Sequence, residues 1–188
     1  MENIGNLELV PEGRRVGRLG ATYLMAPFCH VSPDRKSRFS DGSFGVLYSG
    51  NVFEVALLET IHHHERFMTR TKEPAGWTSQ FREIIMSIDA RLHDLRKPDA
   101  DQLQSLDPDS YAISQKLSAQ LRAAGSDGLV YPSARHKVGE CVALFYPNLA
   151  ANAVQGRHLD YHWDTTKVDF YRDTSNGQVF KIISDTEA

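Results

Sequence analysis

The chain of 188 residues has the length of one domain, and its composition already limits its class. Apolar residues make up 41% and charged residues 24%, which is ordinary globular usage and argues against a disordered chain. Lys and Arg total 21 against 24 Asp and Glu, and this net charge of −3 argues against direct nucleic-acid binding. No apolar run reaches the length of a membrane helix and no secretory pattern opens the chain, so we expect a cytoplasmic protein without membrane contact.

The organisation of the chain is expected to be simple, because no internal repeat or low-complexity tract divides it. We expect an N-terminal arm over residues 1–21, which are rich in glycine, and one domain over residues 22–188. Short apolar runs predict buried strands at Thr22–Cys29 and Phe44–Ser49. The two cysteines are far apart and form no CxxC motif, which favours buried thiols while leaving one disulfide open.

The clearest predicted helix follows the second strand and is expected to run to about Met68. Asn51 is the expected N-cap, and Glu54 lies three residues later, as in a capping box. Apolar residues recur along it at helical spacing. They are Phe53, Ala56, Leu57, Ile61 and Met68.

A second helix is expected to begin at Asp107-Pro108 and to end before Gly125, because proline favours the first helical position and glycine the C-terminal cap. Its predicted core residues are Ile113, Leu117 and Leu121. The remaining predicted strands are Phe81–Asp89, Gly128–Tyr131, Cys141–Tyr146, His158–Trp163, Val168–Tyr171 and Gln178–Ile183. This order of elements indicates an α+β fold with a mixed β core flanked by helices. Neither a GxGxxG motif nor a P-loop is present.

Glu59 lies in the middle of the first predicted helix, away from its apolar stripe. His62 and His63 follow three and four residues later, on the same side. The carboxylate is interpreted either as facing a cleft or as an exposed side chain supported by His63. Adjacent histidines in His62-His63-His64 point about 100° apart, so no two share a face and we expect no metal site.

Three further polar residues are candidates for ligand binding. Arg38 lies in a loop before a strand, where its planar fork suits a phosphate or carboxylate, or is simply solvated. Tyr48 ends that strand, and the structural alternative is a core tyrosine with its hydroxyl at the rim. Ser133 shares a loop with His136, but no GxSxG elbow surrounds it, so we expect ligand orientation or a turn role rather than acyl transfer.

Taken together, the segments SRFSDGSFGVLYSG, EVALLETIHHHERF and GSDGLVYPSARHKVGECVALF resemble the RES domain, a family named for an Arg, a Glu and a Ser. The resemblance covers roughly residues 22–147. The matching positions of the family pattern are Arg38, Tyr48, Glu59, Ser133 and Arg135. One departure is the absence of the Arg that many members carry on the first strand, and Arg18 and His30 are the candidates to replace it.

The resemblance implies a fold similar to ADP-ribosyltransferases and NAD+ as the substrate, with no separate cofactor. RES proteins are typically toxins that cleave the nicotinamide–ribose bond, and an Xre-type antitoxin neutralises them in complexes that are commonly multimeric. It further implies a catalytic set of Glu59, Arg38 and Ser133, in which Glu59 stabilises charge on the ribose, and a group of residues that bind NAD+. For that binding role the candidates are Arg38, Tyr48, Ser133, Arg135 and His30.

Alternative functions stay open at this point. Some family members transfer ADP-ribose to a protein, so the same site is compatible with a protein ADP-ribosyltransferase. The missing strand Arg motivates a third hypothesis, a degenerate RES domain that only binds a partner or nucleotide. A ribonuclease-like toxin using His62, His63 and His136 is disfavoured by the net charge of −3.

Overall fold

A computed structural model describes residues 5–107 and 110–183, and it separates into two compact units. The first unit comprises Met1–Ala56 and Met86–Ala153, and the second comprises Leu57–Ile85 and Val154–Ala188. The described strands form two four-stranded sheets accompanied by helices, so the predicted α+β class is confirmed. Within the described ranges, no helix has the length and apolar character needed to cross a membrane.

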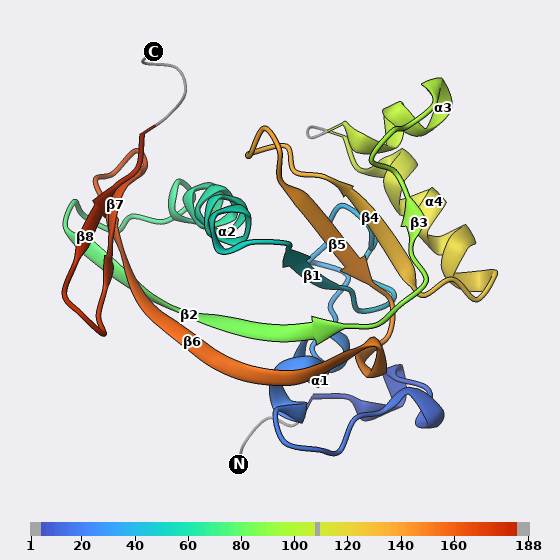
Figure 1. The fold of residues 1–188 in the computed structure, drawn as a ribbon. Helices are drawn as coiled ribbons and strands as arrows, with labels where there is room; N and C mark the ends of the chain where they lie inside the picture. The colour runs from blue at the N-terminus through green and yellow to red at the C-terminus, as the bar shows by residue number, and fades with distance from the viewer. Residues whose placement is uncertain (1–4, 108–109, 184–188) are drawn as a thin grey trace. The chain divides into compact units, whose positions relative to one another are not determined.

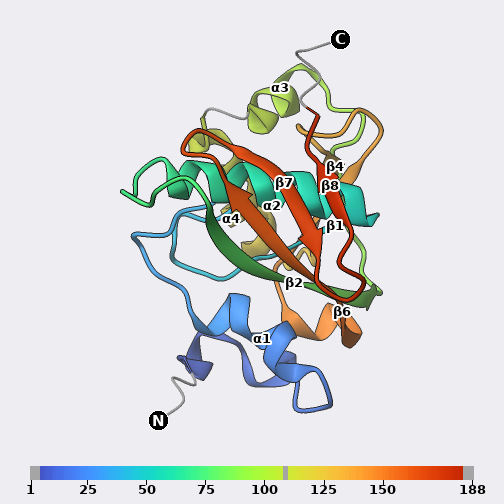
Figure 2. The same ribbon diagram turned by 90° about the vertical axis from the view of Figure 1, so that its left-hand side faces the viewer.

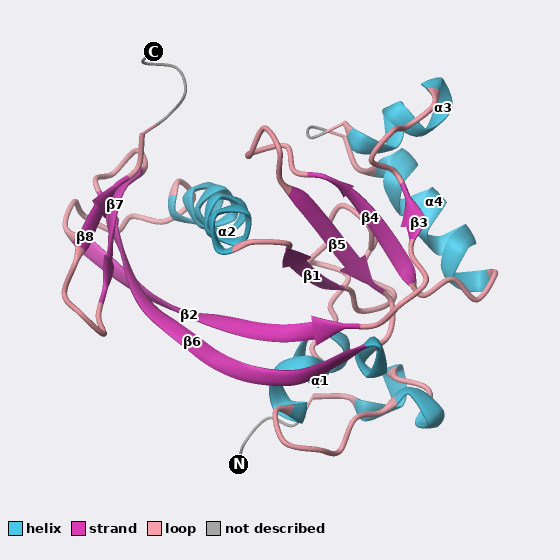
Figure 3. Cartoon of the chain, in the orientation of Figure 1, coloured by secondary structure: helices cyan, strands magenta, loops and turns pink. Residues whose placement is uncertain are grey.

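The sheet of the first unit has the strand order β1-β5-β4-β3. Its members are β1 (Leu47–Gly50), β5 (Glu140–Leu144), β4 (Gly128–Pro132) and β3 (His93–Asp94). Strand β5 runs antiparallel to both of its neighbours, so β1 and β4 are parallel and their carboxyl ends lie at one edge of the sheet. Helices α3 (Ala100–Leu103) and α4 (Ala112–Ala123) lie beside β3 and β4 (Figures 1 and 3).

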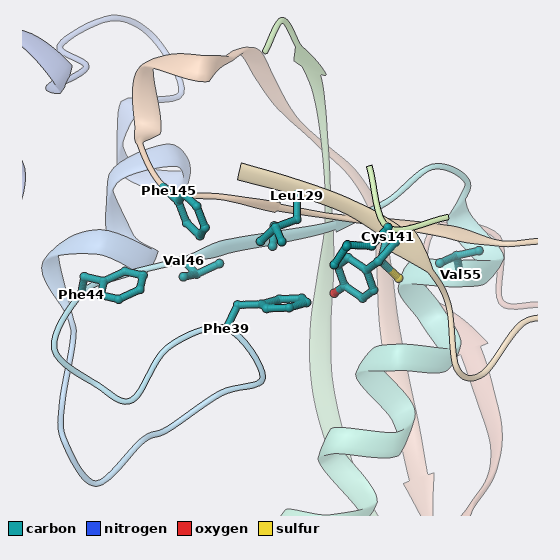
Figure 4. Close-up of a cluster of buried hydrophobic side chains, with 10 residues drawn as sticks. Phe39, Phe44, Val46, Val55, Leu129, Cys141 and Phe145 are labelled. Atoms are coloured by element: carbon teal, nitrogen blue, oxygen red, sulfur yellow. The ribbon is translucent and has the colours of Figure 1, made fainter. Parts of the chain in front are cut away.

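A buried apolar cluster fills the first unit (Figure 4). The labelled members of the cluster are Phe39, Phe44, Val46, Val55, Leu129, Cys141 and Phe145. Alternate residues of the strands supply one part of it, because successive strand side chains point to opposite faces. Val55, in the first turn of α2 (Phe53–Met68), belongs to the same cluster, so the start of this helix is anchored in the first unit.

The sheet of the second unit has the order β2-β6-β7-β8. Its members are β2 (Trp77–Ile88), β6 (Ala150–Trp163), β7 (Val168–Asp173) and β8 (Val179–Lys181). Strands β6 and β7 are antiparallel, and both views show β7 beside β8 (Figures 1 and 2). The α2 residues Leu57, Ile61 and Met68 are buried at helical spacing, which confirms most of the predicted stripe, although Ala56 is exposed.

The segment Thr22–Cys29 is a helix, α1 (Ala21–Cys29), so its prediction as a strand is wrong. A short apolar run does not distinguish a buried strand from a short helix, and here the spacing of the buried side chains decides. Those side chains are Leu24, Met25, Phe28 and Cys29. Pro27 lies in the last turn of α1, after which the helix ends at Cys29.

Two predicted helix features also need correction. Helix α2 begins at Phe53, one residue later than expected, and the side chain of Asn51 accepts the N–H of Glu140 at 3.1 Å. Helix α4 begins at Ala112, while Pro108 lies outside the described residues. Ile113 is 45% exposed rather than part of the core, and the fully buried side chains of this helix are Ser114 and Ser118. Gly125 has a φ of +82° and lies two residues after the last residue of α4, where a glycine commonly ends a helix.

Glu65 on α2 is a second-unit residue whose substitution tests the role of a half-buried carboxylate. Its Oε1 accepts the N–H of fully buried Val168 at 2.8 Å, and burial raises the pKa of Glu65. A raised folded-state pKa means that its stabilising contribution is largest below the unfolded pKa and is lost as the pH rises through the folded value. Glu65→Gln keeps an acceptor without charge and should leave the unfolding midpoint at pH 7 unchanged or higher.

Glu65→Ala leaves the Val168 N–H without its acceptor and should cost about 1–3 kcal/mol. Thermal unfolding at pH 5 and pH 7 checks both changes. The wild type should gain more stability than Glu65→Gln on going to pH 5. Equal losses in the Gln and Ala variants at pH 7 would contradict the assignment.

Candidate functional site

Arg38 lies in a tight turn, Ser37–Ser40, that two backbone hydrogen bonds close. The N–H of Ser37 donates to Ser40 O at 2.8 Å, and the N–H of Ser40 donates to Ser37 O at 3.4 Å. Phe39 is 0% exposed, with its ring stacked 6.4 Å from that of Tyr48 and edge-on to Tyr131 at 5.0 Å. Burial of Phe39 therefore fixes where its neighbour Arg38 leaves the core.

The guanidinium of Arg38 is already oriented by the chain. Its Nη1 donates to Leu106 O at 2.8 Å and more weakly to Asp107 O at 3.5 Å. Its Cζ lies 5.6 Å from the centre of the Tyr111 ring, within range of a cation–π contact. In the described part of the chain, Nε and Nη2 make no hydrogen bond, so these donors remain for an anion.

Tyr48 has its hydroxyl turned inward and its ring partly open, which reverses the predicted alternative of a hydroxyl at the rim. The hydroxyl accepts the N–H of Phe39 at 3.0 Å and lies 2.9 Å from Ser37 Oγ. Burial raises the pKa of Tyr48 to about 12, whereas the residue as a whole is 40% exposed. Tyr48 is therefore neutral at physiological pH and leaves ring surface for a planar ligand.

Side chains of helix α4 donate hydrogen bonds to the carbonyls of the Arg38 turn, and the sequence patterns did not indicate these contacts. The Nε2 of Gln115 donates to Ser37 O and Ser40 O at 2.8 and 3.2 Å. Ser114 Oγ donates to Arg38 O at 2.6 Å, and Ser118 Oγ donates to Phe39 O at 2.8 Å. The available signal was the pair of serines four residues apart on a helix, where apolar residues would be expected on the buried face.

Ser133 begins the loop that joins β4 to β5. Its N–H donates to Gly139 O at 2.8 Å, and its Oγ accepts the N–H of Arg135 at 3.1 Å. The turn role expected of this serine is therefore present. Ser133 is half-buried, whereas Arg135 is exposed.

The Ser133 loop lies against the first turn of α2. A Cβ on Gly139 would overlap Val55 Cγ2, so only glycine allows this approach. Asn51, before the helix, exchanges two hydrogen bonds with Glu140, since its N–H donates to Glu140 O at 3.0 Å and its Oδ1 accepts the Glu140 N–H. The first unit thus brings the Ser133 loop and the start of α2 together at one sheet edge.

Glu59 lies on α2 one turn after Val55, and these two residues share a face of the helix. It is half-buried and belongs to the second unit. Among the neighbouring histidines, His64 turns to the sheet, 5.0 Å from the Phe81 ring, and burial lowers the pKa of His64. In residues 5–107 and 110–183, no group of three or more His, Cys, Asp or Glu side chains is arranged to hold a metal ion.

The two candidates for the missing strand Arg lie on either side of α1. His30 is exposed and directly follows that helix. Arg18 precedes it, and its Nη2 donates to Ala150 O at 3.1 Å, so this guanidinium is partly occupied by the backbone. Cys29, which closes α1, and Cys141 are free and buried, as the preferred interpretation of the cysteines expected.

The fold and this site define an α+β domain with an oriented arginine, an open tyrosine ring and a serine turn. The chain belongs to the RES domain family, since the model of that family, described as "RES domain", matches residues 14–164. The chain is also similar to the uncharacterized protein y4oC of Sinorhizobium fredii, with 27% identity over 182 residues. That match covers 89% of this chain and 72% of the relative.

Proposed function

We propose that this protein is a RES-type toxin that degrades NAD+ by cleaving the nicotinamide–ribose bond, with water or phosphate as the acceptor. The observation that carries the proposal is the Arg38 turn beside the open ring of Tyr48. An arginine with free donors suits the pyrophosphate of a dinucleotide, and an exposed aromatic ring suits its flat, cationic nicotinamide. Membership in the RES domain family supports NAD+ as the dinucleotide that is bound.

Glu59 is proposed as the catalytic carboxylate. When the bond between C1′ of the ribose and the nicotinamide nitrogen breaks, its electron pair goes to the ring and positive charge develops on the ribose. A carboxylate beside the ribose stabilises that oxocarbenium-like state. The oxygen of water or phosphate then bonds to C1′, and water loses its proton to the carboxylate or to solvent. Nicotinamide leaves as a neutral molecule, so no general acid is required.

The remaining candidates are assigned to binding. Arg38 is proposed to hold the pyrophosphate and Tyr48 to pack against nicotinamide. Ser133 is proposed to form a hydrogen bond with the ribose or with the carboxamide of nicotinamide. Arg135 and His30 are proposed to contact phosphate. An Xre-type antitoxin is proposed as the protein partner that covers this site.

The direct test is to incubate the purified protein with NAD+ and to follow nicotinamide and ADP-ribose by chromatography, with and without phosphate. Free nicotinamide should appear as NAD+ disappears, and a phosphorylated ADP-ribose product should form if phosphate is the acceptor. Intact NAD+ after long incubation would refute the proposal. ADP-ribose attached to added protein would instead identify a transferase.

Arg38→Lys should raise the KM for NAD+ about tenfold while changing kcat less. A lysine supplies a point charge, so it cannot bond Leu106 O and a pyrophosphate at the same time in the way that the guanidinium fork can. Initial rates of nicotinamide release at varied NAD+ give both constants. Arg35→Lys, at an exposed position of the same loop, is the matched control and should behave like the wild type.

A further inference from the structure

We infer that Gln115 on α4 is a positioning residue for Arg38 and sets the affinity for NAD+ without contacting it. This inference rests on the proposed function, because it takes Arg38 as the residue that binds the pyrophosphate. It concerns a polar cluster that α4 presents to the turn Ser37–Ser40.

All four carbonyls of the turn accept a hydrogen bond from a side chain of α4. Gln115 donates hydrogen bonds to the carbonyls of Ser37 and Ser40. Ser114 and Ser118 donate to the two carbonyls between them, those of Arg38 and Phe39. In addition, the N–H of Phe39 donates to the hydroxyl of Tyr48 on β1. Side chains of both α4 and β1 therefore hold the turn that carries Arg38 before any ligand arrives.

Gln115 differs from the two serines in the hydrogen-bond acceptors that remain to each side chain if the turn moves. Ser114 Oγ also lies 3.0 Å from Tyr111 O, and Ser118 Oγ lies 2.9 Å from Gln115 O, so both hydroxyls keep an acceptor within the helix region itself. Within the described residues, the only acceptors of the Gln115 amide are the two carbonyls of the turn. Both are acceptors only, so the two hydrogens of Nε2 are matched to them and the amide orientation is fixed.

Both the backbone and the side chain of Arg38 contact α4 or the segment just before it. Its backbone carbonyl is bonded by α4, while its guanidinium is bonded by Leu106 O and lies over the Tyr111 ring just before α4. If the backbone of the turn moves relative to these groups, the free donors of the guanidinium move with it. A displaced charge weakens pyrophosphate binding but does not alter the carboxylate that acts on the ribose.

The test replaces Gln115 with Met, which has similar length and no donor, and uses Gln120→Met as the matched control. Gln120 is exposed on the same helix. Gln115→Met should raise the KM for NAD+ about three- to tenfold, as the loss of one or two hydrogen bonds predicts, with kcat within about twofold of the wild type. Gln120→Met should leave both constants unchanged.

Two further variants separate positioning from general destabilisation. In an Arg38→Ala background, Gln115→Met should raise KM no further, because both changes act through the same guanidinium. Gln115→Asn keeps the donors on a shorter side chain and should give an intermediate KM, and it carries the test if the Met variant does not fold.

The outcomes for this inference and for the proposed function are distinct. Wild-type KM values in both Gln115 variants of a chain that cleaves NAD+ would overturn the inference and leave the proposed function standing. Equal KM increases with and without Arg38 would also overturn it. A wild-type protein that does not cleave NAD+ would overturn the proposed function, and this inference with it.

Discussion

Glu59→Gln is expected to lower kcat for nicotinamide release by about 10²–10³-fold, the largest effect on activity that we predict. The substitution keeps the size of the side chain and removes the negative charge that stabilises the developing positive charge on the ribose. Because the amide still bonds to hydroxyl groups, the KM for NAD+ should change little. Release of nicotinamide, measured under saturating NAD+, gives the loss directly.

The matched control is Glu54→Gln in the first turn of the same helix, where the carboxylate is exposed. It removes the same charge from α2 and should leave kcat within about twofold of the wild type. Thermal unfolding of both variants shows whether the fold is retained. Retained turnover in a folded Glu59→Gln protein would disprove the role assigned to this carboxylate.

Phe39→Ala is expected to cost about 3–5 kcal/mol of unfolding free energy, the largest stability effect that we predict. The side chain is 0% exposed and packs between the rings of Tyr48 and Tyr131, so its loss leaves a cavity among aromatic neighbours. The same change removes the anchor next to Arg38. The KM for NAD+ should therefore rise under conditions in which the variant is still folded.

Denaturant unfolding measures the stability loss, and Phe67→Ala provides the control. Phe67 is 63% exposed on α2, so its truncation should change the unfolding free energy by no more than about 0.5 kcal/mol. Phe39→Leu should lose less than Phe39→Ala because it fills part of the cavity. A loss below about 1 kcal/mol in Phe39→Ala would mean that the turn does not depend on this ring.

The elements with strong local signals could be predicted from the sequence. Helix α2 has a long periodic stripe and ends at Met68 as expected, and β4 and β5 follow apolar runs with glycine at their borders. Helix α1 could not be predicted, because a short and mostly apolar segment fits either a helix or a strand. The serines of α4 were missed because their acceptors lie 76 and 79 residues away in the chain.

For the candidate site, residue type was predictable and orientation was not. The sequence indicated an arginine, a tyrosine and a serine suited to a polar ligand. It did not show that the Tyr48 hydroxyl bonds the turn, because that requires the strand and the loop to be in place. Gln115 carries no motif at all, and its importance arises only from two carbonyls that lie 78 and 75 residues away.

The hydrogen bonds from α4 side chains to the carbonyls of the Ser37–Ser40 turn affect which substitutions this protein tolerates during evolution. Gln115 recognises main-chain carbonyls, which every residue type offers, so substitutions within the turn leave its hydrogen bonds in place. A ligand also meets a turn whose conformational entropy was already lost during folding, which lowers the cost of binding. Selection for a well-folded α4 and selection for a competent arginine therefore act on the same hydrogen bonds.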